Sequence, residues 1–212
     1  MTNHEHGAWH RTVIPASTET TLRGLRDAHL LDRFYLAGGT GLALQFGHRL
    51  SLDLDFFSTE HFDENSLLQL IQNLDRFALV AKAPYTLHAT IQETKVSFLG
   101  YAYPVLFPAN LFFDVPVADP HDIACMKLSA IASRGTKRDF VDLYMCIVRY
   151  GLAEILLLFD QKYAQTNYSR IHLLKSLTYF ADAEKDPMPH MLVTLDWEEV
   201  KQFFLREVPR LL

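Results

Sequence analysis

Two cysteines and no long apolar run limit what this 212-residue chain can be. Cys125 and Cys146 lack the CxxC spacing of a zinc site and are too few for a secreted disulfide framework, so we expect buried thiols in a reducing compartment. No apolar stretch approaches the roughly 20 residues that span a bilayer. The first ten residues also lack the charged-then-apolar layout of a secretory signal. These absences predict a cytoplasmic protein with no membrane partner.

Positive charge is not in excess either. The chain has 20 Lys and Arg against 25 Asp and Glu, which gives a formal net charge of −5. Proteins that coat nucleic acid are usually basic, so any nucleic-acid partner must meet a local basic patch. Hydrophobic residues make up 49% and charged residues 21%, close to the globular average. A chain of this length and composition can bury a core without disulfides or a structural metal.

The pattern of apolar residues changes near residue 119. Before it we expect helices over 17–30, 40–46 and 65–74 and strands over 34–37, 51–57, 77–82, 85–92, 95–101 and 111–117. After it we expect helices over 120–133, 138–150, 152–164, 169–182 and 197–207. Asp119 followed by Pro120 predicts the start of the first of these, as an N-cap before a first-turn proline. The fold class is therefore α+β, with a mixed α/β part in residues 1–118 and a helical part in residues 119–212.

Residues 51–57, SLDLDFF, form the most informative segment. In a strand, residues two apart share a face, so Asp53 and Asp55 are expected to point the same way, about 6–7 Å apart at Cα. Carboxylates at that spacing can converge on Mg²⁺, which prefers oxygen ligands and suits phosphoryl chemistry. A half-exposed strand with both aspartates in water is the alternative. Asp is disfavoured in strands, so the pair needs either a metal or solvent.

A glycine-rich turn lies about fifteen residues before that segment. Gly38, Gly39 and Thr40 stand between an expected strand and an expected helix, where glycines and free helix N–H groups let a backbone approach a phosphate. An ordinary tight turn capped by Thr40 is the alternative. Arg49 and Ser51 follow, and for Arg49 a phosphate partner and a carboxylate partner are equally plausible.

A second informative segment is 122–144, DIACMKLSAIASRGTKRDFVDLY. Lys127 has Ile123 and Ile131 four residues away on either side, so it lies near the apolar side of its helix and either snorkels or faces a cleft. Asp139 and Asp142 share a face of the next helix. The stretch from Cys125 to Arg149 is locally basic, which indicates a nucleotide or RNA contact or a solvated helix–helix turn. Its basic residues are Lys127, Arg134, Lys137, Arg138 and Arg149.

Residues 36–57, LAGGTGLALQFGHRLSLDLDFF, resemble the signature of the AbiEii/AbiGii-like nucleotidyltransferase toxins, a type IV toxin–antitoxin family within the DNA polymerase β-like superfamily. Residues 122–144 are similar to the downstream segment of that family. The resemblance implies an α+β, nucleotidyltransferase-like mixed sheet flanked by helices and followed by a helical bundle that completes the active-site cleft. It places metal binding on Asp53 and Asp55, and catalytic roles on these two together with Lys127 and Asp142. Nucleotide binding is expected at Gly38, Gly39, Thr40, Arg49 and Ser51.

The resemblance also implies an activity and its partners. The expected reaction moves an NMP from an NTP to an acceptor hydroxyl with Mg²⁺ or Mn²⁺, and the leading acceptor is RNA at the tRNA 3′ end. An antitoxin protein is the expected partner of such a toxin. Many polymerase β-like enzymes have a third carboxylate on a neighbouring strand, where residues 95–101 have Ser97; Glu93 or Asp114 could substitute. Two alternatives therefore stay open: a catalytically impaired member that binds a nucleotide or a partner, and a small-molecule nucleotidyltransferase of the antibiotic-modifying type.

Overall fold

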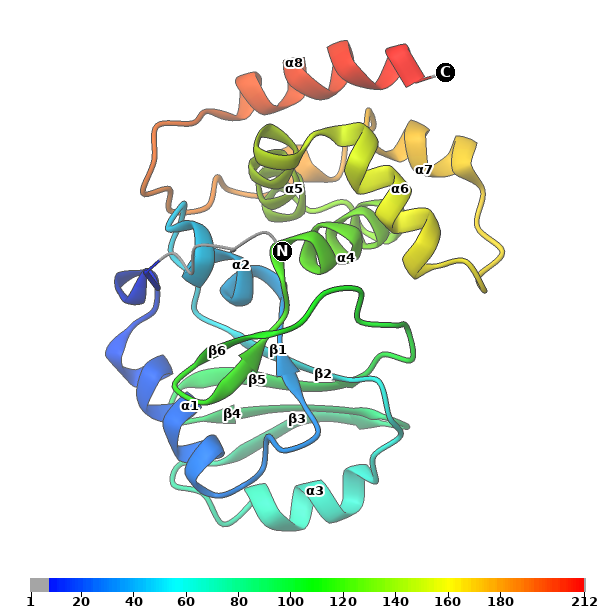
Figure 1. The fold of residues 1–212 in the computed structure, drawn as a ribbon. Helices are drawn as coiled ribbons and strands as arrows, with labels where there is room; N and C mark the ends of the chain where they lie inside the picture. The colour runs from blue at the N-terminus through cyan, green and yellow to red at the C-terminus, as the bar shows by residue number, and fades with distance from the viewer. Residues whose placement is uncertain (1–7, 212) are drawn as a thin grey trace.

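A seven-stranded mixed sheet forms one half of the molecule, and stacked helices form the other (Figure 1). The computed structural model describes residues 8–211. The strand order is β3-β4-β5-β2-β1-β7-β6. The strands are β1 (Tyr35–Leu36), β2 (Leu54–Ser58), β3 (Ala78–Ala83), β4 (Thr86–Ile91), β5 (Thr94–Gly100), β6 (Asn110–Phe112) and β7 (Val115–Val117). Pairs β2/β5 and β1/β7 are parallel and the remaining pairs antiparallel, so the predicted mixed sheet is confirmed.

Eight α-helices accompany the sheet within residues 8–211. They are α1 (Ala16–Asp27), α2 (Gly38–Phe46), α3 (Glu64–Ile71), α4 (Pro120–Ser133), α5 (Lys137–Tyr150), α6 (Leu152–Lys162), α7 (Arg170–Ser176) and α8 (Trp197–Glu207). Short 3₁₀ turns are η1 (Arg11–Val13), η2 (Ala183–Lys185) and η3 (Val208–Leu211). Asp119 caps α4 as the sequence predicts, and Asp196 caps α8; each accepts a hydrogen bond from a first-turn N–H group.

One face of the sheet is buried, and the other carries polar groups. Along β2, Leu54 and Phe56 are fully buried, whereas Asp55 and Phe57 between them are only partly buried. The same alternation runs along β4 and β5, because successive side chains of a strand point to opposite faces. The buried side chains form one core with Leu22 and Leu25 of α1 and Leu67 and Ile71 of α3. Asp55 therefore lies on the face away from that core.

Helix α2 connects the two halves. It contacts β2 on one side and α4 and α5 on the other, and in Figure 1 it lies between the sheet and the stacked helices. Leu42 of α2 belongs to the core of the helical part, and Leu44 belongs to the core of the sheet. The first turn of α2 is thus fixed at the junction, beside the polar face of β2. The predicted division into two units at residue 118 stays a prediction.

Two boundaries near this junction differ from those predicted. The strand expected over 51–57 begins only at Leu54, because the preceding main chain is hydrogen-bonded to groups outside the sheet: Ser51 N–H donates to Val13 (2.8 Å) and the Leu52 carbonyl accepts from Thr18. The helix expected over 40–46 begins at Gly38, which has a φ of +62°. The two glycines therefore form the first turn of α2 rather than a separate turn before it.

The prediction of a single strand over 111–117 was wrong. The chain turns back at Phe113 and Asp114, with φ of +50° and +61°, so that β6 and β7 pair as a hairpin. Positive φ at two consecutive residues is the requirement of a tight hairpin turn, which usually contains Asn or Gly. Neither Asn nor Gly stands at this turn, so the turn was not predicted.

Helix α7 is shorter than the predicted 169–182. It ends at Ser176, before Thr178, Tyr179 and Phe180, which have low helix propensity. Residues 1–7 and 212 lie outside the described residues. Most of the first ten residues, for which we predicted no secretory signal, therefore lie outside them as well. No helix within 8–211 is long and apolar enough to cross a membrane.

Candidate active site

A cavity of about 260 Å³ opens where α2, β2, α4 and α5 meet. It is lined by Gly39, Thr40, Arg49, Ser51, Asp53, Asp55, Lys127, Arg134, Thr136, Arg138 and Asp139. The two sequence segments singled out above therefore meet at one place, although about seventy residues separate them. Of the nine predicted site residues, seven line this cavity, while Gly38 and Asp142 lie immediately behind its wall.

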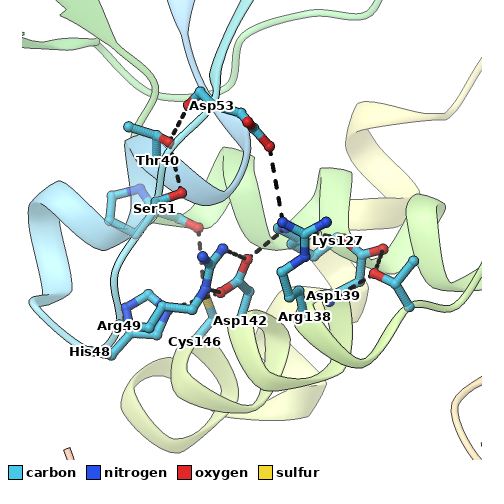
Figure 2. A network of polar contacts seen from close by, with 12 residues as sticks. Thr40, His48, Arg49, Ser51, Asp53, Lys127, Arg138, Asp139, Asp142 and Cys146 are labelled. Carbon is cyan, nitrogen blue, oxygen red and sulfur yellow. Dashed lines mark hydrogen bonds and ion pairs between the residues drawn. The ribbon is translucent and has the colours of Figure 1, made fainter. Parts of the chain in front are cut away.

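The two aspartates of the first segment share this cavity. Asp53 lies just before β2, with a side chain that is 40% exposed and 4.0 Å from the guanidinium of Arg138 (Figure 2). Asp55 lies in β2, beside Gly38. Burial raises the pKa of Asp55, a hydrogen bond from Ser97 lowers it, and the nearby charge of Asp53 raises it further, with a net upward shift. A cation between the two carboxylates would relieve that repulsion.

The donor set suits a hard divalent cation such as Mg²⁺. Carboxylate oxygens are its preferred protein ligands, and in phosphoryl-transfer sites one or two of them share it with substrate phosphates and water. Within residues 8–211 no group of three or more His, Cys, Asp or Glu side chains could hold a metal by itself. Asp53 and Asp55 would therefore hold such an ion together with a bound polyphosphate.

Thr40 ties the first turn of α2 to the carboxylate segment. Its hydroxyl is buried and is hydrogen-bonded to the Ser51 hydroxyl (2.8 Å) and to the main-chain carbonyl of Asp53. Thr40 thus fixes the segment before β2 and is not a free donor. The N–H groups of Gly38, Gly39 and Thr40 precede the first hydrogen bond of α2, which Gly41 donates to Ala37 (3.0 Å).

Arg49 pairs with a carboxylate, which was one of its two predicted roles. Its Nε and Nη2 donate to the two oxygens of Asp142 at 2.7 and 2.8 Å, and Nη1 donates to the Leu50 carbonyl at 2.9 Å (Figure 2). The pair is buried and bidentate, the strongest geometry for these two groups. Arg49 therefore joins the loop after α2 to α5.

The close approach of the Arg49 guanidinium to the main chain explains why residue 39 is a glycine, and it gives a first prediction. A Cβ at Gly39 would overlap Nη2 of Arg49, so Gly39→Ala must displace the guanidinium from Asp142. We expect Gly39→Ala to lower the free energy of unfolding by about 1–3 kcal/mol, as overpacking does. Gly24→Ala is the matched control, because a Cβ there in α1 meets nothing within 4 Å. Urea denaturation should show Gly24→Ala equal to or more stable than wild type; equal loss in both variants would contradict this explanation.

Lys127 lies between two aspartates of α5. Its Nζ is 3.0 Å from Asp139 Oδ1 and 2.6 Å from Asp142 Oδ2, and the side chain is almost fully buried. Burial lowers the pKa of Lys127, but the two carboxylates outweigh burial and raise it overall, so the lysine is charged. Of the two predicted orientations, the structure shows the one that faces the cleft. An ammonium group has three N–H donors, and two are engaged here, which leaves one for a ligand in the cavity.

Asp139 is held by Lys127, Arg134 and Thr136 at 2.7–3.0 Å. Burial raises its pKa, but Lys127 and Arg134 outweigh burial and the net value is about 2. Because this lies below the unfolded value of about 3.9, the carboxylate stabilises the fold fully above about pH 4, and that contribution is lost as the pH falls towards 2. We expect the stability difference between wild type and Asp139→Asn, measured by urea denaturation, to be largest near neutral pH and to shrink at about pH 3. A difference independent of pH would contradict it.

His48 belongs to the same network, and the sequence did not single it out. It is fully buried; its Nε2 lies 2.9 Å from Asp142 Oδ1, and its Nδ1 has no partner among the described residues. The main chain of this loop is also fixed from the C-terminal part: Leu192 N–H donates to the His48 carbonyl, and Leu50 N–H donates to His190. No local pattern reveals these contacts, because they cross about 140 residues of sequence.

The predicted basic stretch divides in the structure. Lys127, Arg134 and Arg138 line the cavity, and the side chains of Arg134 and Arg138 are 66% and 60% exposed. Lys137 and Arg149 do not line it, because each packs over an aromatic ring elsewhere. The basic patch is thus smaller than predicted and is concentrated beside the carboxylates of Asp53 and Asp55.

The two predicted substitutes for a third carboxylate lie elsewhere. Glu93 is in the β4–β5 turn and Asp114 in the β6–β7 turn, both more than four-fifths exposed, paired with Arg76 and Arg26. Neither lines the cavity. Within the described residues, the acids that do line it are Asp53, Asp55 and Asp139, and the last is already neutralised by cations.

Comparison with known proteins finds a family model and a relative that match most of this chain. The family model described as "Nucleotidyl transferase AbiEii toxin, Type IV TA system" matches residues 20–111 and 100–211. The uncharacterized protein aq_aa25 of Aquifex aeolicus (strain VF5) is 40% identical over 185 residues, 84% of this chain and 88% of that protein.

Two solved structures share the fold. MenT4, a nucleotidyltransferase toxin from Mycobacterium tuberculosis H37Rv, superposes with a TM-score of 0.52 at 17% identity, covering 92% of this chain and 88% of that one. The antibiotic-resistance factor ANT(2'')-Ia superposes with a TM-score of 0.51 at 12% identity, covering 69% of this chain and 91% of that one. At these identities the likeness concerns the fold alone.

Proposed function

The chain belongs to the AbiEii nucleotidyl transferase toxin family, and from this premise we propose that it moves an NMP from an NTP to an acceptor hydroxyl. One observation carries the proposal. Asp53 and Asp55 share a cavity with the first turn of α2 and with Lys127, so a polyphosphate and a divalent cation can be bound together. Catalysis of this kind consists mainly of positioning and charge stabilisation, which such a cavity supplies.

The triphosphate is proposed to lie against the first turn of α2. The N–H groups of Gly39 and Thr40 point from a helix N-terminus, which favours anions. The remaining N–H donor of Lys127 and the guanidinium groups of Arg134 and Arg138 neutralise phosphate charge from the opposite wall. Asp142 acts behind the wall by holding Lys127 and Arg49 in place.

Asp53 and Asp55 are proposed to hold Mg²⁺ or Mn²⁺ beside the reacting phosphate. The bound ion would polarise the phosphoryl oxygens and lower the pKa of the acceptor hydroxyl. Because Asp53 is exposed and Asp55 lies deeper, the acceptor approaches from the solvent side of Asp53. Pyrophosphate is the leaving group.

RNA is the proposed acceptor, with the tRNA 3′ end first among its hydroxyls, and the reaction is proposed to act as the toxic activity in the cytoplasm. The exposed guanidinium groups of Arg134 and Arg138 at the cavity support a polyanionic acceptor, since phosphate contacts dominate nucleic-acid binding. The family description, a type IV toxin–antitoxin system, supports an antitoxin protein as the partner.

The test is transfer of label from α-labelled NTPs. The protein is incubated with each NTP in turn, with Mg²⁺ and with total RNA, purified tRNA or small hydroxyl compounds, with and without EDTA. Label that moves to tRNA and is lost with EDTA supports the proposal. Label on small compounds alone would replace the RNA acceptor by a small molecule. Nucleotide binding without any transfer would indicate the catalytically impaired alternative.

A further inference from the structure

The polar face of the sheet continues beyond Asp55 onto the neighbouring strands. Strand β5 lies parallel to β2, and Ser97 is the register partner of Asp55. Strand β4 lies antiparallel to β5, and His88 is the register partner of Ser97. All three side chains are partly buried, between fully buried neighbours on either side along each strand. A row of three polar groups thus crosses three adjacent strands and ends at the cavity.

Side-chain contacts connect this row. His88 Nδ1 lies 3.1 Å from Ser97 Oγ, and the Ser97 hydroxyl lies beside Asp55 across the β2–β5 register, where it lowers the pKa of that carboxyl. A carboxylate that binds a cation is ionised and only accepts hydrogen bonds, so the Ser97 hydroxyl would donate its single proton to Asp55. The Ser97 oxygen would then accept from Nδ1–H of His88. In that arrangement each donor in the row is directed towards Asp55.

The other side of Asp55 is closed by α2. Oδ2 of Asp55 lies 3.0 Å from the position that a Cβ would take on Gly38. Asp55 is thus confined between the first turn of α2 and Ser97, which leaves few rotamers open to it. Carboxylates that bind metals are commonly oriented by such outer hydrogen bonds.

We propose that Ser97 and His88 are positioning residues that orient Asp55 for the divalent cation. This inference rests on the proposed function, because it assigns Asp55 to cation binding. It predicts that loss of either residue weakens cation binding while the protein remains folded, since both side chains are only partly buried.

The test is Mn²⁺ binding in the presence of a non-hydrolysable NTP analogue, followed by electron paramagnetic resonance, in wild type, Ser97→Ala and His88→Ala. We expect Mn²⁺ affinity to fall about 10-fold or more in each, the usual cost of losing an outer hydrogen bond at a metal ligand. Ser97→Thr keeps the hydroxyl and is expected to restore binding. Thr90→Ala is the matched control, because Thr90 is the next partly buried residue on the same face of β4 and pairs with Lys95 rather than Ser97.

Label transfer provides a second readout. We expect the Mg²⁺ concentration for half-maximal rate to rise in Ser97→Ala and His88→Ala, with the KM for the NTP little changed. Unaltered Mn²⁺ affinity in either variant would overturn the role of that residue while the proposed function stands, provided that wild type transfers label. A wild type that neither binds Mn²⁺ nor transfers label would overturn both.

Discussion

Replacing Asp142 by alanine is expected to lower the free energy of unfolding by about 3–5 kcal/mol, the usual cost of removing one partner of a buried ion pair. Asp142 is fully buried and is bonded to His48, Arg49 and Lys127 (Figure 2). Burial raises its pKa, but Lys127 and Arg49 outweigh burial and hold it well below its usual range, so it is ionised. In the variant, two buried cations would lose the carboxylate that neutralises them.

The measurement is urea denaturation followed by circular dichroism. Asp182→Ala is the control, since Asp182 forms only a surface pair with Lys185 and its loss should leave the denaturation midpoint unchanged. Asp142→Asn separates charge from shape, because it keeps the volume and some hydrogen bonds. We expect it to fall between wild type and Asp142→Ala. If Asp142→Ala were as stable as wild type, the network would not hold α5 to the loop after α2.

This part of the structure shows which contacts local sequence patterns predict and which they do not. The two-residue spacing of Asp53 and Asp55 predicted that they share a site, and both line one cavity although only Asp55 lies in a strand. For Arg49 the sequence left two partners open, because its carboxylate is 93 residues away in the chain. Propensity and periodicity act over one or two turns, so they place Arg49 in a loop but do not select Asp142.

Buried polar groups and unusual turns are a second kind of feature that the sequence patterns did not predict. His48 has no periodic neighbours that mark it as buried, and its contacts come from α5 and from the segment that contains Leu192. The turn at Phe113 and Asp114 is similar, since it adopts positive φ without Gly or Asn. Helix caps, by contrast, are local, and the cap at Asp119 was predicted from two residues of sequence.

The largest effect on activity is expected from Asp53→Asn. The substitution keeps the shape of the side chain and removes the charge that attracts a cation to the solvent side of Asp55. Loss of one of two carboxylate ligands is expected to reduce kcat/KM for label transfer by about 10³-fold, or about 4 kcal/mol of transition-state stabilisation. Stability should hardly change, because Asp53 is 40% exposed and its nearest cation, Arg138, is 4.0 Å away. We expect the free energy of unfolding to stay within about 0.5 kcal/mol of wild type.

Asp32→Asn is the matched control for this substitution. Asp32 is a 72% exposed acid outside the cavity, so the same chemical change there should leave both transfer and stability unaltered. The contrast with Asp142 is then informative: Asp53→Asn should remove transfer from a stable protein, whereas Asp142→Ala should destabilise the protein itself. Such a separation follows from their placement, since one carboxylate faces the solvent and the other faces three side chains of the network. Full transfer by Asp53→Asn would exclude this carboxylate from the chemistry and, with it, the proposed use of the cavity.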